Sequence, residues 1–501
     1  MTGDVGNVAD LVARAAREHP AVPGLVDTIA DTVLSWADVD NAVNSFAHRL
    51  LALGLNPGDR VALRLPTSTA FAVGFFAVAR AGGIAVPLSP TAPDAELREL
   101  LTDSGAKLLI SGDGRELADT VTLVTPEIDV GQAQAVPCRS QHEDIAAIFY
   151  TSGTTGPTRG VMLSHRALLA NVEQVRSVRP TIAEHGDRLF IAIPLHHIYG
   201  LGPGLLATTA AGATAVLSQR FDARKALRTC LDERVTVIVG VPAMYTEFAA
   251  LPADEVGEAL STVRLLVSGA APLHPRVLAA IRAATGLAVF EGYGLTEAAP
   301  VVTSTLVTGY AKPGSAGRPL PGIELRLVDS DGAPGPAPLD PADPDDAFPD
   351  DIGLTGLVAI RGPNLFSGYW PDRAHGPDDE GWYRTGDVGY LDVDGDLHLV
   401  DRANDLIIVN GFNVYPREVE DVIMTLPGVA EVAVAGVLDE RSGEAVKAYV
   451  RPAPGAALSE QQVIAVCEAG LARYKVPTRV EFTDELPHSA VGKLRRVRLR
   501  G

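Results

Sequence analysis

Hydrophobic positions in the first hundred residues recur with two different periods. Residues 39–50 carry apolar side chains at helical spacing, and the preceding Ser35-Trp-Ala-Asp38 has the pattern of a capping box. A short apolar run at 61–65 is typical of a strand, and a second helical segment at 69–80 leads to the apolar run 84–86. This order of helix and strand predicts βαβ units on a parallel sheet.

The same alternation continues further along the chain, with strand-length apolar runs at 108–110, 237–241, 265–267 and 288–290. Together these segments predict an α/β fold with parallel sheets. Residues 198–219 are uncharged and long enough to span a bilayer, but their glycines and threonines suit a lipid-facing helix poorly. We therefore expect a buried helix and loop there, and no integral membrane segment.

The pattern changes twice in the second half of the chain. Residues 331–352 are rich in proline and acidic side chains, which predicts a solvated loop between two β segments. Residues 357–400 are rich in strand formers and indicate a small β-barrel-like subdomain. From Asp401 onward, short strands alternate with helices, one of which begins at Pro416. We predict a large N-terminal domain at 1–400 and a small α+β C-terminal domain at 401–501.

Charge and cysteine content restrict the class of protein. The 501 residues carry a formal net charge of −20, which argues against a general binder of nucleic acids or anionic membranes. The three cysteines, Cys138, Cys230 and Cys467, lie far apart and form neither a CxxC pair nor a disulfide framework. The N-terminus lacks the pattern of a signal peptide. We expect a cytoplasmic location.

The segment Thr151 to Gly160 contains three glycines and five hydroxyl side chains, and it follows the apolar run 145–150. Glycine lets backbone N–H groups converge on an anion, hydroxyl groups add donors, and the guanidinium of Arg159 suits phosphate. The segment therefore predicts a polyphosphate-binding loop, although it lacks the Walker pattern. A surface loop of small polar residues has the same composition, and this reading stays open on the segment alone.

Two further strands run into glycine-rich turns. Ligands of open α/β sheets bind at the carboxyl ends of strands, where the chain has Gly269-Ala-Ala271 and then Tyr293. The first offers a flat wall, and the second offers an aromatic face for a planar base. Thr296 and Glu297 would place a hydroxyl and a carboxylate beside the phosphates, which makes sense through a bridging Mg²⁺. Alternatively, Tyr293 is a core aromatic and Glu297 is a solvated acid at a helix start.

Three charged residues near the C-terminus are further candidates. Asp387 follows Gly386 and suits ribose hydroxyls, although an aspartate there is usually a turn former. Arg402 would join a phosphate or ribose, or else form an interdomain ion pair. Lys493 projects from a turn at Gly492, or belongs to a solvated basic tail. The acidic run 392–396 resembles a calcium loop, but its glycine and its twelfth position do not fit, so we predict a hairpin turn.

The order of these motifs resembles that of the adenylate-forming superfamily, which includes acyl- and aryl-CoA synthetases, adenylation domains of nonribosomal peptide synthetases and beetle luciferases. The resemblance runs from about residue 30 to the C-terminus and is strongest to fatty acyl-CoA synthetases. It rests on Tyr150-Thr-Ser-Gly-Thr-Thr-Gly156, Pro194-Leu-His-His197-Ile-Tyr-Gly200, Tyr293-Gly-Leu-Thr-Glu297, Tyr383-Arg-Thr-Gly-Asp387, Asp401-Arg402 with Asp405, Gly411-Phe-Asn-Val-Tyr-Pro416-Arg-Glu418-Val-Glu420 and Gly492-Lys493.

The resemblance implies a two-step ligase that uses ATP, Mg²⁺ and coenzyme A. A carboxylate attacks the α-phosphate of ATP to give acyl-AMP and pyrophosphate, and the thiol of coenzyme A then displaces AMP. In this superfamily the small C-terminal domain rotates between the two steps. Asp401 would then lie at the hinge, and Gly411 would lie on the loop that turns toward the thiol.

The same resemblance implies roles for individual residues. The implied catalytic residues are Lys493, His197, Glu297 and Arg402, and the implied metal ligands are Glu297 and Thr154. His197, Gly200 and Gly202 would bind the acyl group. The implied ATP- and AMP-binding residues are Thr151, Ser152, Gly153, Thr154, Thr155, Gly156, Arg159, Gly269, Ala270, Ala271, Glu291, Gly292, Tyr293, Gly294, Thr296, Asp387, Arg402 and Lys493.

The chain departs from the superfamily pattern at Arg159, which takes the place of a lysine, and in the long insertion 331–352. The absence of lysine and arginine from residues 198–219 predicts an apolar acid, a medium- or long-chain fatty acid, with aryl acids as an alternative. Two other functions stay open: an enzyme that loads a carrier protein, and a nucleotide-binding protein without chemistry. We expect small-molecule partners, no nucleic acid, and a homodimer as the assembly to test.

Overall fold

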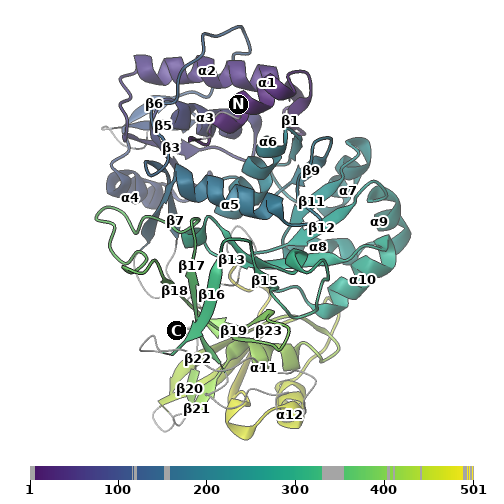
Figure 1. Ribbon diagram of the computed structural model, residues 1–501. Coiled ribbons are helices and arrows are strands. Elements are labelled where there is room, and N and C mark those ends of the chain that lie inside the picture. Colours follow the sequence, from purple (N-terminus) through teal and green to yellow (C-terminus); the bar gives the residue numbers. More distant parts are fainter. Residues whose placement is uncertain are drawn as a thin grey trace. The chain divides into compact units, whose positions relative to one another are not determined.

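The structure is a computed structural model, which describes residues 6–115, 117, 121–151, 158–329, 355–402, 407–409, 412–439, 443–488, 494, 496 and 499. Contacts divide the chain into two compact units. The first comprises Met1–Gly153, Pro157–Glu324 and Arg361–Tyr383, and the second comprises Thr154–Gly156, Leu325–Ile360 and Arg384–Gly501. Figure 1 shows the elements in chain order. The predicted loop 331–352 lies outside the described residues.

The first unit contains a six-stranded sheet in the order β6-β5-β3-β4-β7-β8. Its strands are β3 (Arg60–Arg64), β4 (Ile84–Pro87), β5 (Leu108–Ser111), β6 (Thr122–Val124), β7 (Ile145–Thr151) and β8 (Arg159–Ser164). All neighbours are parallel except β7 and β8, which form an antiparallel pair. The helices α2 (Trp36–Ala52), α3 (Thr69–Arg80) and α4 (Asp94–Ser104) accompany it. The strands and helices predicted for this region are confirmed.

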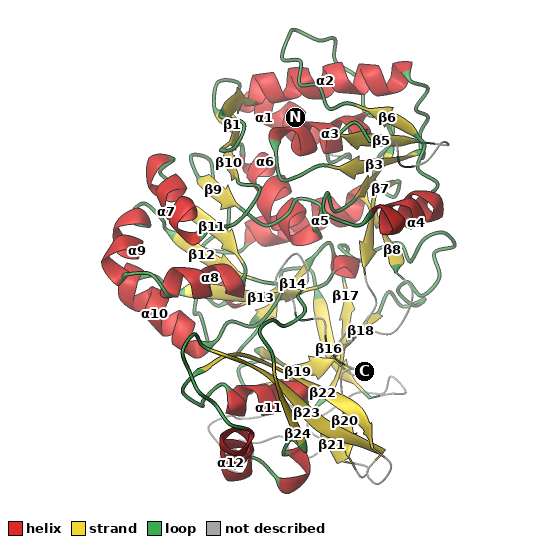
Figure 2. Ribbon diagram, turned by 180° about the vertical axis from the view of Figure 1, so that it is seen from behind, coloured by secondary structure: helices red, strands yellow, loops and turns green. Residues whose placement is uncertain are grey.

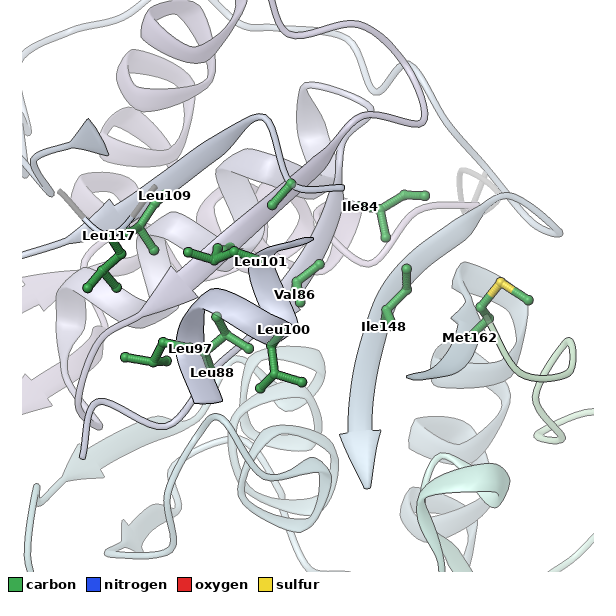
Figure 3. Close-up of a cluster of buried hydrophobic side chains, with 12 residues drawn as sticks. Ile84, Val86, Leu88, Leu97, Leu100, Leu101, Leu109, Leu117, Ile148 and Met162 are labelled. Atoms are coloured by element: carbon green, nitrogen blue, oxygen red, sulfur yellow. The ribbon is translucent and has the colours of Figure 1, made fainter. Parts of the chain in front are cut away.

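A core of buried side chains anchors the β7–β8 pair. Leucines of α4 pack on side chains of β4 and β5, and the same cluster includes Ile148 of β7 and Met162 of β8 (Figure 3). Because all twelve members are at most 9% exposed, the two strands are held firmly up to their connection. The cluster therefore fixes both ends of the predicted phosphate loop.

The second sheet of the first unit has nine strands in the order β15-β14-β13-β12-β11-β9-β10-β1-β2. Its strands are β1 (Pro23–Asp27), β2 (Thr32–Ser35), β9 (Arg188–Ile191), β10 (Thr214–Leu217), β11 (Val237–Gly240), β12 (Leu265–Ser268), β13 (Val289–Gly294), β14 (Val301–Ser304) and β15 (Arg318–Pro319). The strands from β1 to β13 in this order run parallel, whereas β2, β14 and β15 pair antiparallel.

The first unit contains further α-helices among its described residues. They are α1 (Asp10–Glu18), α5 (His165–Ser177), α6 (Ala207–Ala211), α7 (Ala223–Asp232), α8 (Pro242–Ala249), α9 (Ala253–Ala259) and α10 (Pro275–Thr285). Figure 2 shows α7 to α10 beside β11 and β12. The uncharged segment 198–219 forms a π-helix at Gly200–Leu206, then α6 and the strand β10. None of the helices in the described ranges has the length and apolar character needed to cross a bilayer.

The second unit contains two smaller sheets. The order β16-β17-β18-β19 is built from β16 (Glu324–Val328), β17 (Gly356–Arg361), β18 (Tyr383–Leu391) and β19 (Leu397–Arg402). The turn at 392–396 joins the last two strands, so the predicted hairpin turn is confirmed. The predicted domain boundary at Asp401 falls inside β19 and stays a prediction.

The C-terminal part of this unit alternates short strands with helices, as predicted. Its elements are β20 (Ile407–Val409), β21 (Phe412–Val414), α11 (Pro416–Ile423), β22 (Val429–Asp439), β23 (Gly443–Pro452), α12 (Glu460–Gly470) and β24 (Arg479–Phe482). Buried side chains of β20, β22, β23 and both helices form one core. The structure thus confirms an α/β fold with mixed and parallel sheets and a small C-terminal α/β part.

Candidate functional site

The predicted phosphate loop connects the two strands of an antiparallel hairpin. Thr151 at the end of β7 lies opposite Arg159 at the start of β8. Gly160 packs closely, because a Cβ atom added there would lie 2.8 Å from Ile148 Cγ2. The predicted residues Ser152, Gly153, Thr154, Thr155 and Gly156 lie outside the described residues, so their roles stay predictions. The hairpin brings Arg159 to the base of this loop.

Arg159 and Glu297 share one aromatic neighbour, Tyr369. The guanidinium carbon of Arg159 lies 5.4 Å from the centre of the Tyr369 ring, within cation–π range. The Tyr369 hydroxyl donates a hydrogen bond of 2.7 Å to Glu297 Oε1 and lies 3.1 Å from the Tyr383 hydroxyl. Two residues that the sequence singled out separately are thus connected through a side chain that it did not single out.

Tyr369 stays protonated under ordinary conditions. Burial, together with the negative charge of Glu297, raises the pKa of Tyr369 above its usual value of 10. Its hydroxyl is therefore a donor to the carboxylate. The other carboxylate oxygen, Glu297 Oε2, has no partner within the described ranges and is a hard oxygen ligand of the kind that Mg²⁺ prefers. The side chain of Glu297 therefore has the chemistry of a metal ligand, and its role as one stays a prediction.

The carboxyl end of β12 places a glycine against a tyrosine ring. A Cβ atom added to Gly269 would lie 2.6 Å from Cζ of Tyr199, so the ring lies directly on the glycine. The next residue, Ala270, has a φ of 70°, which is unusual for a residue with a side chain. Glu291 on β13 accepts a 2.9 Å hydrogen bond from the Leu273 N–H group. Glu291 thereby fixes the turn that contains Gly269, Ala270 and Ala271.

The glycines of the next predicted motif are required by close backbone contacts. A Cβ atom at Gly292 would lie 2.9 Å from the Thr303 carbonyl oxygen, and one at Gly294 would lie 2.2 Å from that of Pro300. Tyr293 between them is buried. Thr296 and Glu297 follow in a short 3-10 helix, Thr296–Ala298. The nucleotide-binding roles of these residues stay predictions. Among the residues predicted to bind the nucleotide, Glu291 lies opposite Ser268 at the end of β12.

The predicted acyl-binding residues surround the start of the π-helix. His197 Nδ1 accepts a 3.2 Å hydrogen bond from the Tyr199 N–H group. Burial lowers the pKa of the neighbouring His196 to about 4, and its Nδ1 atom is buried without a partner among the described residues. A Cβ atom at Gly200 would lie 2.4 Å from the Pro194 carbonyl oxygen. One at Gly202 would lie 2.9 Å from Pro300 Cδ, so both glycines pack against the protein itself.

The second unit holds the remaining predicted residues. Asp387 on β18 is buried and lies directly opposite Arg402 on β19, while Asp401 lies opposite Val388. Gly411 and Lys493 lie outside the described residues, as do the side chains of Asp401 and Arg402. Their roles stay predictions.

Comparison with known proteins identifies a family for most of the chain. Residues 12–370 match the family model described as "AMP-binding enzyme", and residues 418–493 match "AMP-binding enzyme C-terminal domain". A feruloyl-CoA synthase of Amycolatopsis sp is 38% identical over 92% of both chains. A long-chain-fatty-acid–CoA ligase of Salmonella typhimurium is 33% identical over 99% of this chain and 94% of its own.

Solved structures of similar proteins agree with this. The crystal structure of ATP-bound MatB from Rhodopseudomonas palustris has a TM-score of 0.88 and 33% identity, and it covers 99% of this chain and 98% of its own. An anthranilate CoA ligase in complex with anthranoyl-AMP has a TM-score of 0.86 and 28% identity, with 98% and 96% of the two chains covered.

Proposed function

The chain belongs to the family of AMP-binding enzymes and is an acyl- or aryl-CoA ligase; we propose that its substrate is an apolar monocarboxylic acid, a medium- or long-chain fatty acid. Its co-substrates would be ATP and coenzyme A. The observation that carries the ATP-dependent step of the proposal is the shared contact of Arg159 and Glu297 with Tyr369 at the base of the hairpin loop. That contact joins the arginine that we propose binds phosphate to the carboxylate that we propose binds the metal.

In the first step, a carboxylate oxygen of the acid attacks the α-phosphorus of ATP, and the bond to the β-phosphate breaks to release pyrophosphate. Two anions must approach each other, so positive charge is needed around the transferring group. Arg159 would contact the phosphates, and Lys493 would bind the carboxylate and the α-phosphate. Glu297 and Thr154 would hold Mg²⁺, which when bound neutralises further phosphate charge. Asp387 would bind the ribose hydroxyls.

In the second step, the thiol of coenzyme A attacks the carbonyl carbon of acyl-AMP, and AMP leaves with the electrons of the broken C–O bond. The thiol loses its proton in this step. The pyrophosphate side must be cleared for this reaction, and in our proposal the C-terminal part turns about Asp401. Gly411 would then line the path of the thiol. Closure of a small domain around a fixed active site is a common way to gate such steps.

The acid is expected to have one carboxylate. No lysine or arginine occurs from residue 198 to 219 or from 298 to 302, so a second carboxylate would be buried without a cation. We expect acids of about eight carbons or more to give faster AMP release with coenzyme A than acetate or malonate, because each buried methylene adds about 0.8 kcal/mol. A coupled AMP-release assay across C2 to C18 acids measures this, and a preference for malonate or acetate would contradict it.

An aryl acid is a second candidate, favoured by two buried polar atoms that are close in sequence to Gly269 and Tyr199. Ser268 Oγ and His196 Nδ1 are buried without partners among the described residues. An unsatisfied buried polar group costs roughly 1–3 kcal/mol, which a polar substituent on a bound ring would offset. The feruloyl-CoA synthase relative is consistent with this candidate. Hydroxylated aryl acids in the same assay would then exceed octanoate.

The acceptor is tested separately from the acid. With the best acid of the panel, we expect thioester to form with free coenzyme A. If thioester formed only on the phosphopantetheine arm of a carrier protein, the chain would instead be a carrier-loading enzyme. If no carboxylate supported exchange of pyrophosphate into ATP, the chain would be a nucleotide-binding protein without this chemistry.

A further inference from the structure

Tyr369 contacts the two charged groups of the phosphate-binding region by two different parts of its side chain. The face of its ring lies 5.4 Å from the Arg159 guanidinium carbon, and its hydroxyl donates to Glu297 Oε1 at 2.7 Å. The ring therefore contacts the cation, while the hydroxyl holds the anion. A shift of Tyr369 would move both charges.

The backbone around Tyr369 is tied to the same hairpin that carries Arg159. Trp370 N–H donates to the Gly160 carbonyl oxygen at 2.7 Å, and Ser367 N–H donates to that of Met162 at 2.9 Å. Tyr369 also forms an antiparallel bridge with Val161. The segment around residue 369 thus extends the edge of β8, which leaves the ring little freedom relative to Arg159.

Aromatic packing restricts the ring further. The Phe366 ring packs edge-on against Tyr369 with 5.1 Å between centroids, and against Tyr383 with 4.9 Å. The Phe366 N–H group donates a 2.9 Å hydrogen bond to the carbonyl oxygen of Glu297. The short helix that carries Glu297 is therefore held to the segment of Tyr369 through both backbone and side chain.

We propose that Tyr369 is a positioning residue that fixes Arg159 and Glu297 relative to each other, so that together they bind the Mg²⁺-bound phosphates of ATP. This inference rests on the proposed function, in which Glu297 is a metal ligand. It also explains in physical terms why arginine, and not the lysine of the superfamily pattern, stands at position 159. A planar guanidinium stacks on an aromatic face and keeps free N–H donors at its edge, whereas an ammonium group does so less well.

The hydroxyl is tested with Tyr369→Phe, which keeps the ring. Calorimetry without any acid substrate gives the dissociation constants of ATP with a chelator and of ATP with Mg²⁺. The metal-free constant divided by the Mg²⁺ constant measures the contribution of the metal. In Tyr369→Phe, Glu297 loses its donor, so we expect this ratio to fall about tenfold, or about 1.4 kcal/mol, while binding of metal-free ATP is unchanged. An unchanged or larger ratio would overturn the proposal.

Tyr150→Phe is the matched control. Tyr150 lies on the same hairpin, and its hydroxyl also donates to a carboxylate, that of Asp103, but it touches neither Arg159 nor Glu297 in any described contact. We expect wild-type binding ratios for this variant. Equal effects of the two substitutions would mean that the loss comes from general weakening of the hairpin, which also overturns the positioning role.

The ring is tested by a double-mutant cycle with Arg159→Ala. If the ring positions the guanidinium, Arg159→Ala should weaken Mg²⁺–ATP binding several-fold less in a Tyr369→Leu background than in a Tyr369→Phe background. Additive effects would exclude the ring from the mechanism, and Tyr369→Met serves in the same cycle if Tyr369→Leu does not fold. Because no acid is present, these binding results do not depend on which acid is the substrate. A wrong substrate proposal would show only in the AMP-release assay across different acids.

Discussion

The superfamily resemblance assigns Gly269 to the nucleotide, but Gly269 packs on Tyr199, which lies in the segment predicted to bind the acid, so we expect a methyl group there to affect the acid. A Cβ atom there would lie 2.6 Å from Tyr199 Cζ, and Tyr199 is itself buried, so its ring cannot move away freely. Overpacking of this kind costs about 1–3 kcal/mol. We expect Gly269→Ala to lower kcat/KM for the acid by roughly 10- to 100-fold, with little change in the KM for ATP.

Two controls distinguish the contact between the added methyl group and the Tyr199 ring from a general loss of stability. The double variant Gly269→Ala with Tyr199→Ala removes the ring that the methyl group meets, and it should recover acid binding while changing which acids are preferred. Gly112→Ala introduces the same methyl group where the nearest atom is 3.9 Å away, and it should behave like the wild type. Loss of ATP binding in Gly269→Ala, rather than of acid selectivity, would contradict this role and support the nucleotide-binding role that the resemblance implies.

His165, the first residue of α5, connects that helix to the N-terminal segment. Its Nδ1 atom accepts a 3.2 Å hydrogen bond from the Val8 N–H group, and its Nε2 atom lies 3.0 Å from Ser140 Oγ. Burial lowers the pKa of His165 to about 4, from an ordinary value of 6.5. Because the pKa of His165 is lower in the folded than in the unfolded state, its neutral form makes its full contribution to the free energy of unfolding above about pH 6.5. That contribution is lost as the pH falls toward 4.

On acidification we expect the unit that contains His165 to lose about 3 kcal/mol of its free energy of unfolding. Each pH unit between the folded and unfolded pKa values of His165 is worth about 1.36 kcal/mol. Urea unfolding at pH 7.5 and pH 4.5 measures it. The wild type should lose more stability between these conditions than His165→Gln does. His48→Gln, which replaces an exposed histidine on α2, should match the wild type. Equal pH dependence of all three proteins would refute the role of His165.

Among the helices and strands, those marked by a short-range sequence pattern could be predicted from the sequence. The capping box at Ser35 and the apolar runs of β3, β11 and β12 are short-range patterns, and the corresponding elements are present. The strand β10 was not predicted, because Thr214–Leu217 is four residues long and lies in a uniformly uncharged segment. Local pattern did not resolve that segment into helix, turn and strand.

In the candidate site, too, features carried by contiguous sequence could be predicted, whereas features that depend on long-range contacts could not. The glycines, Glu297 and Arg159 could be singled out because their motifs are contiguous in the sequence. Tyr369 could not, because its importance comes from long-range pairing of residue 369 with β8 and from its hydrogen bond to Glu297. The packing of Gly200 and Gly202 against Pro194 and Pro300 could not be predicted either, because it depends on how the folded backbone brings these residues together.

For the whole molecule, the proposed alternation of domains predicts that two variants lose opposite half-reactions. Lys493 would neutralise charge only while the carboxylate and the α-phosphate react. We therefore expect Lys493→Ala to slow acyl-AMP formation by roughly 10²- to 10³-fold, the usual effect of removing one donor to a transition state. Thioester formation from supplied acyl-AMP should be spared. Pyrophosphate release without coenzyme A and thioester yield from synthetic acyl-AMP measure the two steps separately.

Asp401→Pro should give the reverse result, because proline holds φ near −65° and would lock the proposed hinge. Asp401 also lies in β19, which is the end strand of its four-stranded sheet, so proline there removes a backbone donor as well. Leu399→Pro is the matched control, since it removes a donor two residues earlier in the same strand and leaves residue 401 intact. If Asp401→Pro keeps adenylation and loses thioester formation while Leu399→Pro keeps both, rotation about residue 401 is supported. If Asp401→Pro and Lys493→Ala lose the same half-reaction, the two steps do not use alternate positions of the C-terminal part.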